Sequence, residues 1–121
     1  MSAMKHLLLA AGLLLSACTT TQPPFVPAVL GVELPASIGA TASLPVTVTV
    51  DLACGRFDGY TTERTRNQLS IQVRGTQPEG AVCVAAVRPH TFTFTDSGAL
   101  PRTGPFQVLV GGRVWGTVEV Q

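Results

Sequence analysis

The three cysteines of this chain, at positions 18, 54 and 83, carry its most reactive side chains. Cys18 ends the tetrapeptide Leu15-Ser16-Ala17-Cys18, which follows the apolar run Leu7–Leu15 and the basic residue Lys5. A basic start, an apolar run of this length and small residues before a cleavage point are typical of a secretory signal peptide. The sequence therefore predicts that residues 1–17 are removed during export.

The same tetrapeptide, Leu15-Ser16-Ala17-Cys18, resembles the lipobox of bacterial lipoproteins and matches it at all four positions. The resemblance implies that the mature chain begins at Cys18, carries acyl chains such as palmitate there, and sits on the non-cytoplasmic side of a bacterial envelope membrane. The apolar run is about half the length that spans a bilayer, so the lipid rather than a helix would be the anchor. Residues 18–27 contain three prolines and are predicted to be a flexible tether.

Cys54 and Cys83 remain as an even pair in an exported chain, where disulfides persist. A bridge between them closes a loop of about 30 residues and stabilises the fold by roughly 3–4 kcal/mol in the chain-entropy model. We therefore predict a Cys54–Cys83 disulfide. Two buried free thiols, or half of a metal site, are the alternative interpretations.

The other candidate chemical groups do not assemble into a predicted active site. A zinc site needs three or four ligands, and with the cysteines paired His90 lacks partners, so we predict no metal and no cofactor. Asp96-Ser97-Gly98 places a serine near His90, but a nucleophilic serine needs a base and a third group that orients the base. The tripeptide is typical of a turn, and no catalytic residue is predicted.

Charge excludes one class of partner. The chain has eight basic and seven acidic residues, and its only lysine, Lys5, leaves with the signal peptide. The mature domain is therefore close to neutral, and its arginines are spread along the chain rather than clustered. A protein without a basic patch is not expected to bind nucleic acid.

The densest polar stretch offers a possible partner contact. Arg64 and Arg66 could bind an anionic glycan or a protein, whereas the alternative is that their charges protect an edge strand from pairing with other chains. Phe57 and Tyr60 lie nearby and could form an exposed aromatic contact or a lid on the core. We take these four residues as the candidate contact set.

Apolar and polar residues alternate after the tether, as is typical of half-buried β-strands. The predicted inward-facing sets are Val46, Val48, Val50 and Leu52; Leu69, Ile71 and Val73; Phe92 and Phe94; Phe106, Val108 and Val110; and Val114, Val118 and Val120. The run 82–87 is predicted to be a strand covered on both faces. Trp115 would point with Glu119, as an exposed contact or as a cover over the second face.

Turn residues separate these runs. Gly111-Gly112 predicts a two-residue hairpin, because glycine tolerates the positive φ that such turns need. Further turns are marked by Pro78-Glu79-Gly80, Asp96-Ser97-Gly98 and Pro101–Pro105. About seven short strands without helical periodicity predict an all-β fold, an antiparallel β-sandwich over residues 28–121. A small β-barrel is the alternative.

The chain from about residue 44 to its end resembles the immunoglobulin-like sandwich domains of bacterial envelopes. The likeness is carried by Cys54 at a strand end, Ile71-Gln72-Val73, Cys83 after a Pro/Gly turn, and Gly104–Gly112. The last stretch is similar to a Gly-x-aromatic-x-Val-x-Val-Asn-Gly end strand, with Gly111 in place of the usual asparagine. The resemblance implies an immunoglobulin-like fold and carries over no catalytic residue, since such sandwiches host unrelated roles.

Together these patterns predict a lipid-anchored envelope protein that is not an enzyme and acts as an interaction or structural module. An envelope protein or a glycan would be its partner, and the lipid on Cys18 would join it to the membrane. A second hypothesis is an immunoglobulin-like inhibitor whose loops at one end of the sandwich block an envelope or secreted hydrolase. A small hydrolase is the third.

Overall fold

The computed structural model describes residues 24–78, 80, 83 and 86–121, and within them the chain forms nine strands. The first part contains β1 (Pro24–Phe25), β2 (Ala28–Glu33), β3 (Ser37–Ile38), β4 (Leu44–Asp51) and β5 (Arg56–Arg64). The second part contains β6 (Gln68–Thr76), β7 (Pro89–Asp96), β8 (Phe106–Val110) and β9 (Arg113–Val120). No helix that could cross a membrane occurs in the described residues.

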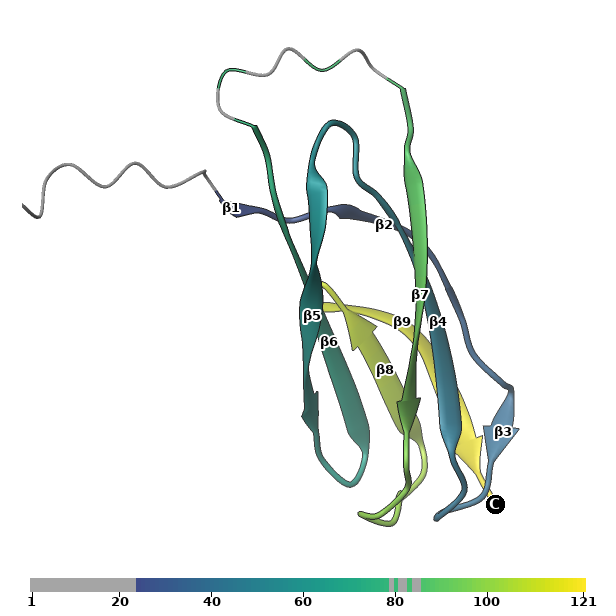
Figure 1. Ribbon diagram of the computed structural model, residues 1–121. Helices are drawn as coiled ribbons and strands as arrows, with labels where there is room; N and C mark the ends of the chain where they lie inside the picture. Colours follow the sequence, from purple (N-terminus) through teal and green to yellow (C-terminus); the bar gives the residue numbers. More distant parts are fainter. Residues whose placement is uncertain (1–23, 79, 81–82, 84–85) are drawn as a thin grey trace, which may run out of the picture.

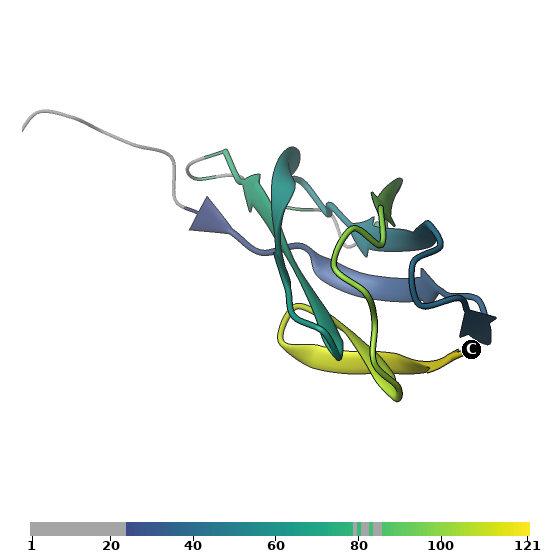
Figure 2. The ribbon, with the colours of Figure 1, turned by 90° about the horizontal axis from the view of Figure 1, so that it is seen from below.

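The strands form two sheets that pack face to face (Figures 1 and 2). One sheet has the order β2-β4-β7 and is antiparallel throughout. The other places β5, β6, β8, β9 and β3 side by side, and β1 pairs with the end of β6. The predicted all-β sandwich is confirmed, with seven strands of five or more residues and the two-residue strands β1 and β3 in the described part.

Two strand pairs depart from the predicted antiparallel arrangement. β6 pairs with β8 in parallel, and β3 pairs with β9 in parallel. A parallel pair needs a long connection, because the chain must return to the same end of the sheet before it adds the next strand. Between β6 and β8 that return is made through β7 in the opposite sheet. Only the tertiary arrangement could show this, since the alternation along a strand does not report its direction.

The core lies between the sheets and is made by the predicted inward faces. The buried apolar side chains are Leu44, Val46, Val48, Val50, Leu52, Leu69, Ile71, Val73, Phe106, Val108, Val110 and Val118. Most are β-branched residues, which pack well on a pleated surface. The period-two pattern therefore identified the core of β4, β6 and β8 correctly.

The β8–β9 hairpin confirms the predicted turn and corrects one predicted face. Gly111 and Gly112 have φ values of +64° and +78°, as a type I′ turn requires. Beyond the turn, Val108 pairs with Gly116 but Leu109 pairs with Val114, so Trp115 is an extra residue in β9. This bulge reverses the alternation: Val114 is 47% exposed, and Trp115 packs against the core instead of pointing outward with Glu119.

Two predicted segment assignments change as well. Pro24 and Phe25, which the sequence places in the tether, pair with Thr76 and Gly75 of β6, so strand pairing already includes these two residues before residue 28. In the run 82–87, Cys83 and the residues 86 and 87 are not in a strand, and Val87 is 61% exposed. The rest of that run, and residues 1–23 with Cys18, lie outside the described residues.

Candidate functional site

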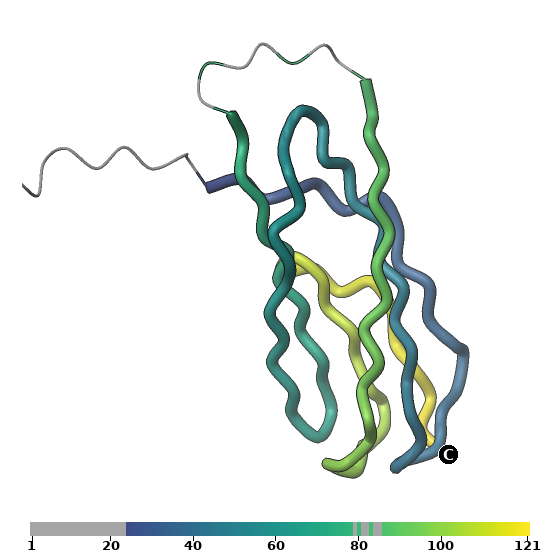
Figure 3. The backbone as a smooth tube through the Cα atoms, viewed as in Figure 1, coloured from purple at the N-terminus to yellow at the C-terminus, as the bar shows by residue number. Residues whose placement is uncertain are grey.

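The sandwich has two distinct ends (Figures 1 and 3). The β1 end carries β1, the turn 52–55 and the hairpin turn 111–112. The loop end carries three connections: residues 39–43 before β4, residues 65–67 between β5 and β6, and residues 97–105 between β7 and β8. Different interactions hold the two ends together.

Asp96, the last residue of β7, is the centre of the loop end. Its carboxylate accepts hydrogen bonds from Arg102 Nη2 at 2.6 Å and from Arg64 Nε at 3.1 Å. The side chains of Arg102, Arg64 and Asp96 are 0%, 15% and 11% exposed, respectively. Two arginines therefore share one carboxylate in a water-poor site, where ion pairs are screened much less than at the surface.

The same two guanidinium groups fasten the loops to each other. Arg102 Nη1 donates to the carbonyl oxygens of Gly39 at 3.0 Å and Ala42 at 2.6 Å. Arg64 Nη2 donates to the carbonyl oxygen of Leu100 at 2.7 Å. Both guanidinium groups also lie over the Phe106 ring, at 4.8 Å for Arg64 and 5.6 Å for Arg102. We call Asp96, Arg64, Arg102 and Phe106 the Asp96 cluster.

Backbone bonds complete the connection between the loops. The N–H of Arg102 donates to Ala40 at 2.9 Å, and the N–H of Thr103 donates to Arg66 at 2.8 Å. Gly98 adopts a φ of +77°, and a Cβ there would lie 2.5 Å from the carbonyl oxygen of Thr41. The three loops are therefore held as one rigid unit. Such a unit favours binding, because the loops lose little conformational entropy when a partner binds.

The four candidate contact residues fall into two groups. Arg66 is exposed at the loop end, while Arg64 belongs to the Asp96 cluster. Phe57 and Tyr60 are partly buried and bridge the two sheets: Phe57 stacks on Phe92 at 5.3 Å, and Tyr60 stacks on Phe92 at 4.6 Å. The lid interpretation fits these contacts, and the four residues do not form one surface.

Sequence reasoning missed Asp96 and Arg102 as partners. The sequence pattern places Asp96 only in a turn, and Arg102 lies between turn residues, where no periodic pattern indicates burial. Glycine and proline around Arg102 indicate a loop, and loop residues are mostly exposed. A buried arginine in such a segment is visible only once the carboxylate and the carbonyl groups are placed around it.

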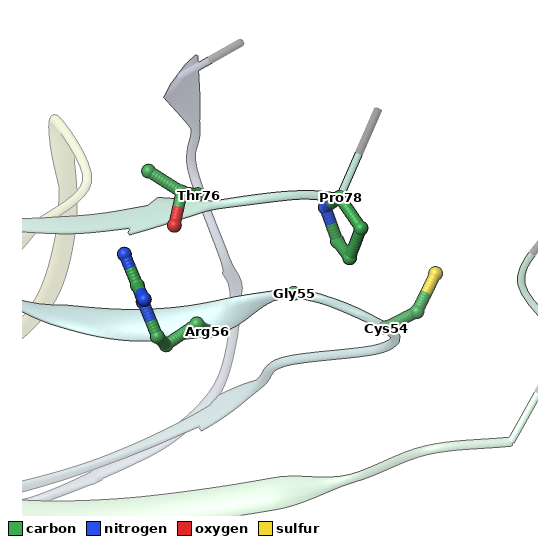
Figure 4. A pocket seen from close by; sticks show the side chains of 5 residues that line it. All are labelled: Cys54, Gly55, Arg56, Thr76 and Pro78. Atoms are coloured by element: carbon green, nitrogen blue, oxygen red, sulfur yellow. The ribbon is translucent and has the colours of Figure 1, made fainter. Parts of the chain in front are cut away.

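At the β1 end, the predicted disulfide joins Cys54 and Cys83, with a Cα–Cα distance of 5.5 Å. The prediction of a bridge is thus confirmed. Cys54 also lines a hollow of about 150 Å³ together with Gly55, Arg56, Thr76 and Pro78 (Figure 4). This volume is below the range of small-molecule sites, which begins at about 300 Å³.

Asp51 supports the same end from the last position of β4. Its Oδ1 accepts hydrogen bonds from the N–H of Ala53 at 2.8 Å and of Arg88 at 3.0 Å. The Arg88 hydrogen bond, followed by that of Ala53, lowers the pKa of Asp51 below its ordinary value. Arg88 Nη1 in turn donates to the carbonyl oxygen of Ala53 at 3.1 Å, so carboxylate and guanidinium together fix the turn before Cys54.

The fold and its two fastened ends define a small, disulfide-bonded β-sandwich. Residues 44–120 match the ORF11 beta-sandwich domain, and the chain belongs to this family. Searches of curated proteins and of solved structures found no match. The matched region starts at β4, so it includes the disulfide and the Asp96 cluster but not β1, β2 or β3. Among the described residues, no group of three or more His, Cys, Asp or Glu side chains could hold a metal ion.

Proposed function

We propose that the chain is a lipid-anchored, non-enzymatic interaction module of the bacterial cell envelope whose loop end meets a partner protein. The observation that carries this proposal is the Asp96 cluster, which fixes connections from three parts of the chain into one surface. An interaction surface gains affinity when its loops are ordered before binding, since ordering them during binding would cost free energy.

Two features support the anchored location. The signal-like segment ends in a lipobox-like tetrapeptide at Cys18, and the Cys54–Cys83 disulfide suits an oxidising compartment outside the cytoplasm. Five residues lie between Cys18 and Pro24, and the six chain steps from one to the other span about 20 Å at most. The tether would therefore hold the β1 end near the membrane.

The side chains at the loop end indicate the chemistry of the partner. The exposed residues there include Thr41, Ser43, Thr65, Arg66, Asn67, Leu100, Pro101 and Thr103. Arg66 can bind a carboxylate in a two-pronged geometry, and Leu100, which is 38% exposed, offers an apolar contact. A protein surface with a carboxylate beside an apolar side chain would complement this end. If that partner is a hydrolase, the module acts as its inhibitor, which is the second form of the proposal.

Capture of partners from envelope extracts by the full chain tests the loop end. Arg66→Glu should lower recovery of the partner by about tenfold or more, because the new negative charge would face the carboxylate of the partner. Arg74→Glu is the matched control, since Arg74 is also exposed but lies on β6 toward the β1 end. Equal recovery with both variants, or equal loss with both, would contradict the loop-end assignment.

The anchor is tested separately by Cys18→Ala and membrane fractionation. Stable attachment needs about two acyl chains, so the variant should leave the membrane fraction or remain unprocessed. A variant that is matured and retained like the wild type would show that Cys18 carries no anchor. The inhibitor form predicts that the captured partner is one hydrolase whose activity falls when the wild-type chain is added.

A further inference from the structure

The edge strands of this sandwich differ in how well they resist pairing with another chain. The β2 ladder shifts register between Val29 and Gly31, and the β5 ladder shifts between Phe57 and Gly59. β9 contains the bulge at Trp115, and β1 and β3 have two residues each. Bulges and short strands discourage strand addition. β7 has neither protection, because it pairs with β4 in unbroken register over all eight residues.

The open side of β7 presents free backbone groups. In the described residues β7 is the last strand of its sheet and pairs only with β4. The N–H of Leu52 donates to the carbonyl of Arg88 at 3.0 Å, just before β7 begins. Bonded and non-bonded pairs alternate along an antiparallel ladder, so Phe92 and Phe94 bond to β4. Thr91, Thr93 and Thr95 therefore direct their N–H and C=O groups to the open edge.

Side-chain contacts agree with this alternation. The hydroxyl groups of Thr47 and Thr93 lie 3.0 Å apart, and those of Thr49 and Thr91 are also 3.0 Å apart. Opposite side chains come closest in the non-hydrogen-bonded pairs. The threonines of β7 are exposed on the outer face, while Phe92 and Phe94 are partly buried on the inner face. The free edge thus has a defined set of donors and acceptors.

The sequence of β7 is symmetric about Thr93. Reading Thr91-Phe92-Thr93-Phe94-Thr95 in either direction gives the same order. Two such strands, antiparallel and centred on Thr93, would place threonine opposite threonine on the outer face and phenylalanine opposite phenylalanine on the inner face. The five residues carry no charge, so like charges would not meet across the axis.

We infer that β7 is a dimerisation strand, which pairs with β7 of a second copy around a two-fold axis at Thr93. The pairing joins two β2-β4-β7 sheets into one sheet of six strands. Thr91, Thr93 and Thr95 of each copy supply the free groups, and their partners are Thr95, Thr93 and Thr91 of the second copy. Such an interface is isologous, as expected for a closed dimer. The antiparallel pairing places the loop end of each copy beside the β1 end of the other, and it does not depend on the proposed partner or anchor.

Native mass spectrometry of the full chain released from detergent tests the dimer. The wild type should give a species of twice the monomer mass. Thr93→Pro should abolish it, because proline removes the central N–H at the open edge and leaves the bonds to β4 intact. Thr93→Val is the matched control, since it also loses the hydroxyl contact with Thr47 but keeps the N–H, and it should remain dimeric.

Two further variants keep the test decisive if Thr93→Pro does not fold. Thr93→Lys should also give monomers, because two lysines would face each other across the axis. With a thiol crosslinker of about 8 Å, Thr93→Cys should link to its own copy, whereas two Thr91→Cys residues would be about 13 Å apart along the strands. A wild-type monomer, a dimer that survives Thr93→Lys, or equal crosslinking at both positions would overturn the inference.

Discussion

The two ends of the sandwich are fastened by different chemistry. At the β1 end, a covalent bond between Cys54 and Cys83 acts beside the exposed Asp51–Arg88 contacts. At the loop end, a carboxylate and two arginines are withdrawn from water and bonded to the backbone of three loops. A disulfide stabilises the fold mainly by restricting the conformations of the unfolded chain. A buried ion cluster, in contrast, stabilises the folded state only when every charged partner is present.

One small domain is therefore held at both ends by independent interactions. Reduction breaks the covalent bond at the β1 end, and it leaves the Asp51–Arg88 contacts and the Asp96 cluster chemically unchanged. Loss of one charge in the cluster leaves the disulfide unchanged but leaves the remaining charges buried without a partner. The two perturbations share no bonding partner, so their effects on the free energy of unfolding should add to within about 0.5 kcal/mol.

The largest expected effect comes from Asp96→Ala. Removing the carboxylate leaves the fully buried Arg102 without its counter-charge, and breaking a buried ion pair in this way costs about 3–5 kcal/mol. Urea unfolding of the full chain measures the loss. Asp58→Ala is the control, since its ion pair with Arg56 is at the surface and should contribute less than about 1 kcal/mol. Similar losses in both variants would mean that burial at the loop end does not matter.

The next largest effect is expected from the disulfide. The double variant Cys54→Ser with Cys83→Ser should lower the free energy of unfolding by about 3–4 kcal/mol, as expected for a closed loop of this size. Thermal melts with and without reductant measure it, and the reductant should have no effect on the double variant. Combining these substitutions with Asp96→Ala tests additivity, and a total well below the sum would show that the two ends are coupled.

The smallest expected effect concerns Asp51 and is a pH dependence. Its folded pKa is lowered, so its contribution is complete above the pKa of the unfolded chain and is lost as the pH falls through the folded pKa. Melts between pH 2 and pH 7 should show a loss of stability at the acid end that is smaller in Asp51→Asn. Unchanged acid sensitivity in that variant would argue that the hydrogen bonds from Ala53 and Arg88 do not favour the carboxylate.

The fold class, the disulfide and the closing turn could all be predicted from the sequence alone. Alternation in β4, β6 and β8 identified their buried faces because a strand with one face in the core must repeat every two residues. The turn at Gly111 and Gly112 requires positive φ values, which few residues other than glycine adopt without strain. An even pair of cysteines behind a predicted signal peptide was enough to predict a disulfide, since such bonds persist in exported proteins.

The interruption of the apolar–polar alternation in β9, and the contacts between buried polar groups, could be seen only in the tertiary structure. The bulge at Trp115 turned Val114 outward, because one extra residue exchanges the two faces of a strand. The parallel β6–β8 pair depends on the path of the chain between the sheets. Asp96, Arg64 and Arg102 come from separate segments, so no local pattern links them, and their burial becomes favourable only when all their bonds form together.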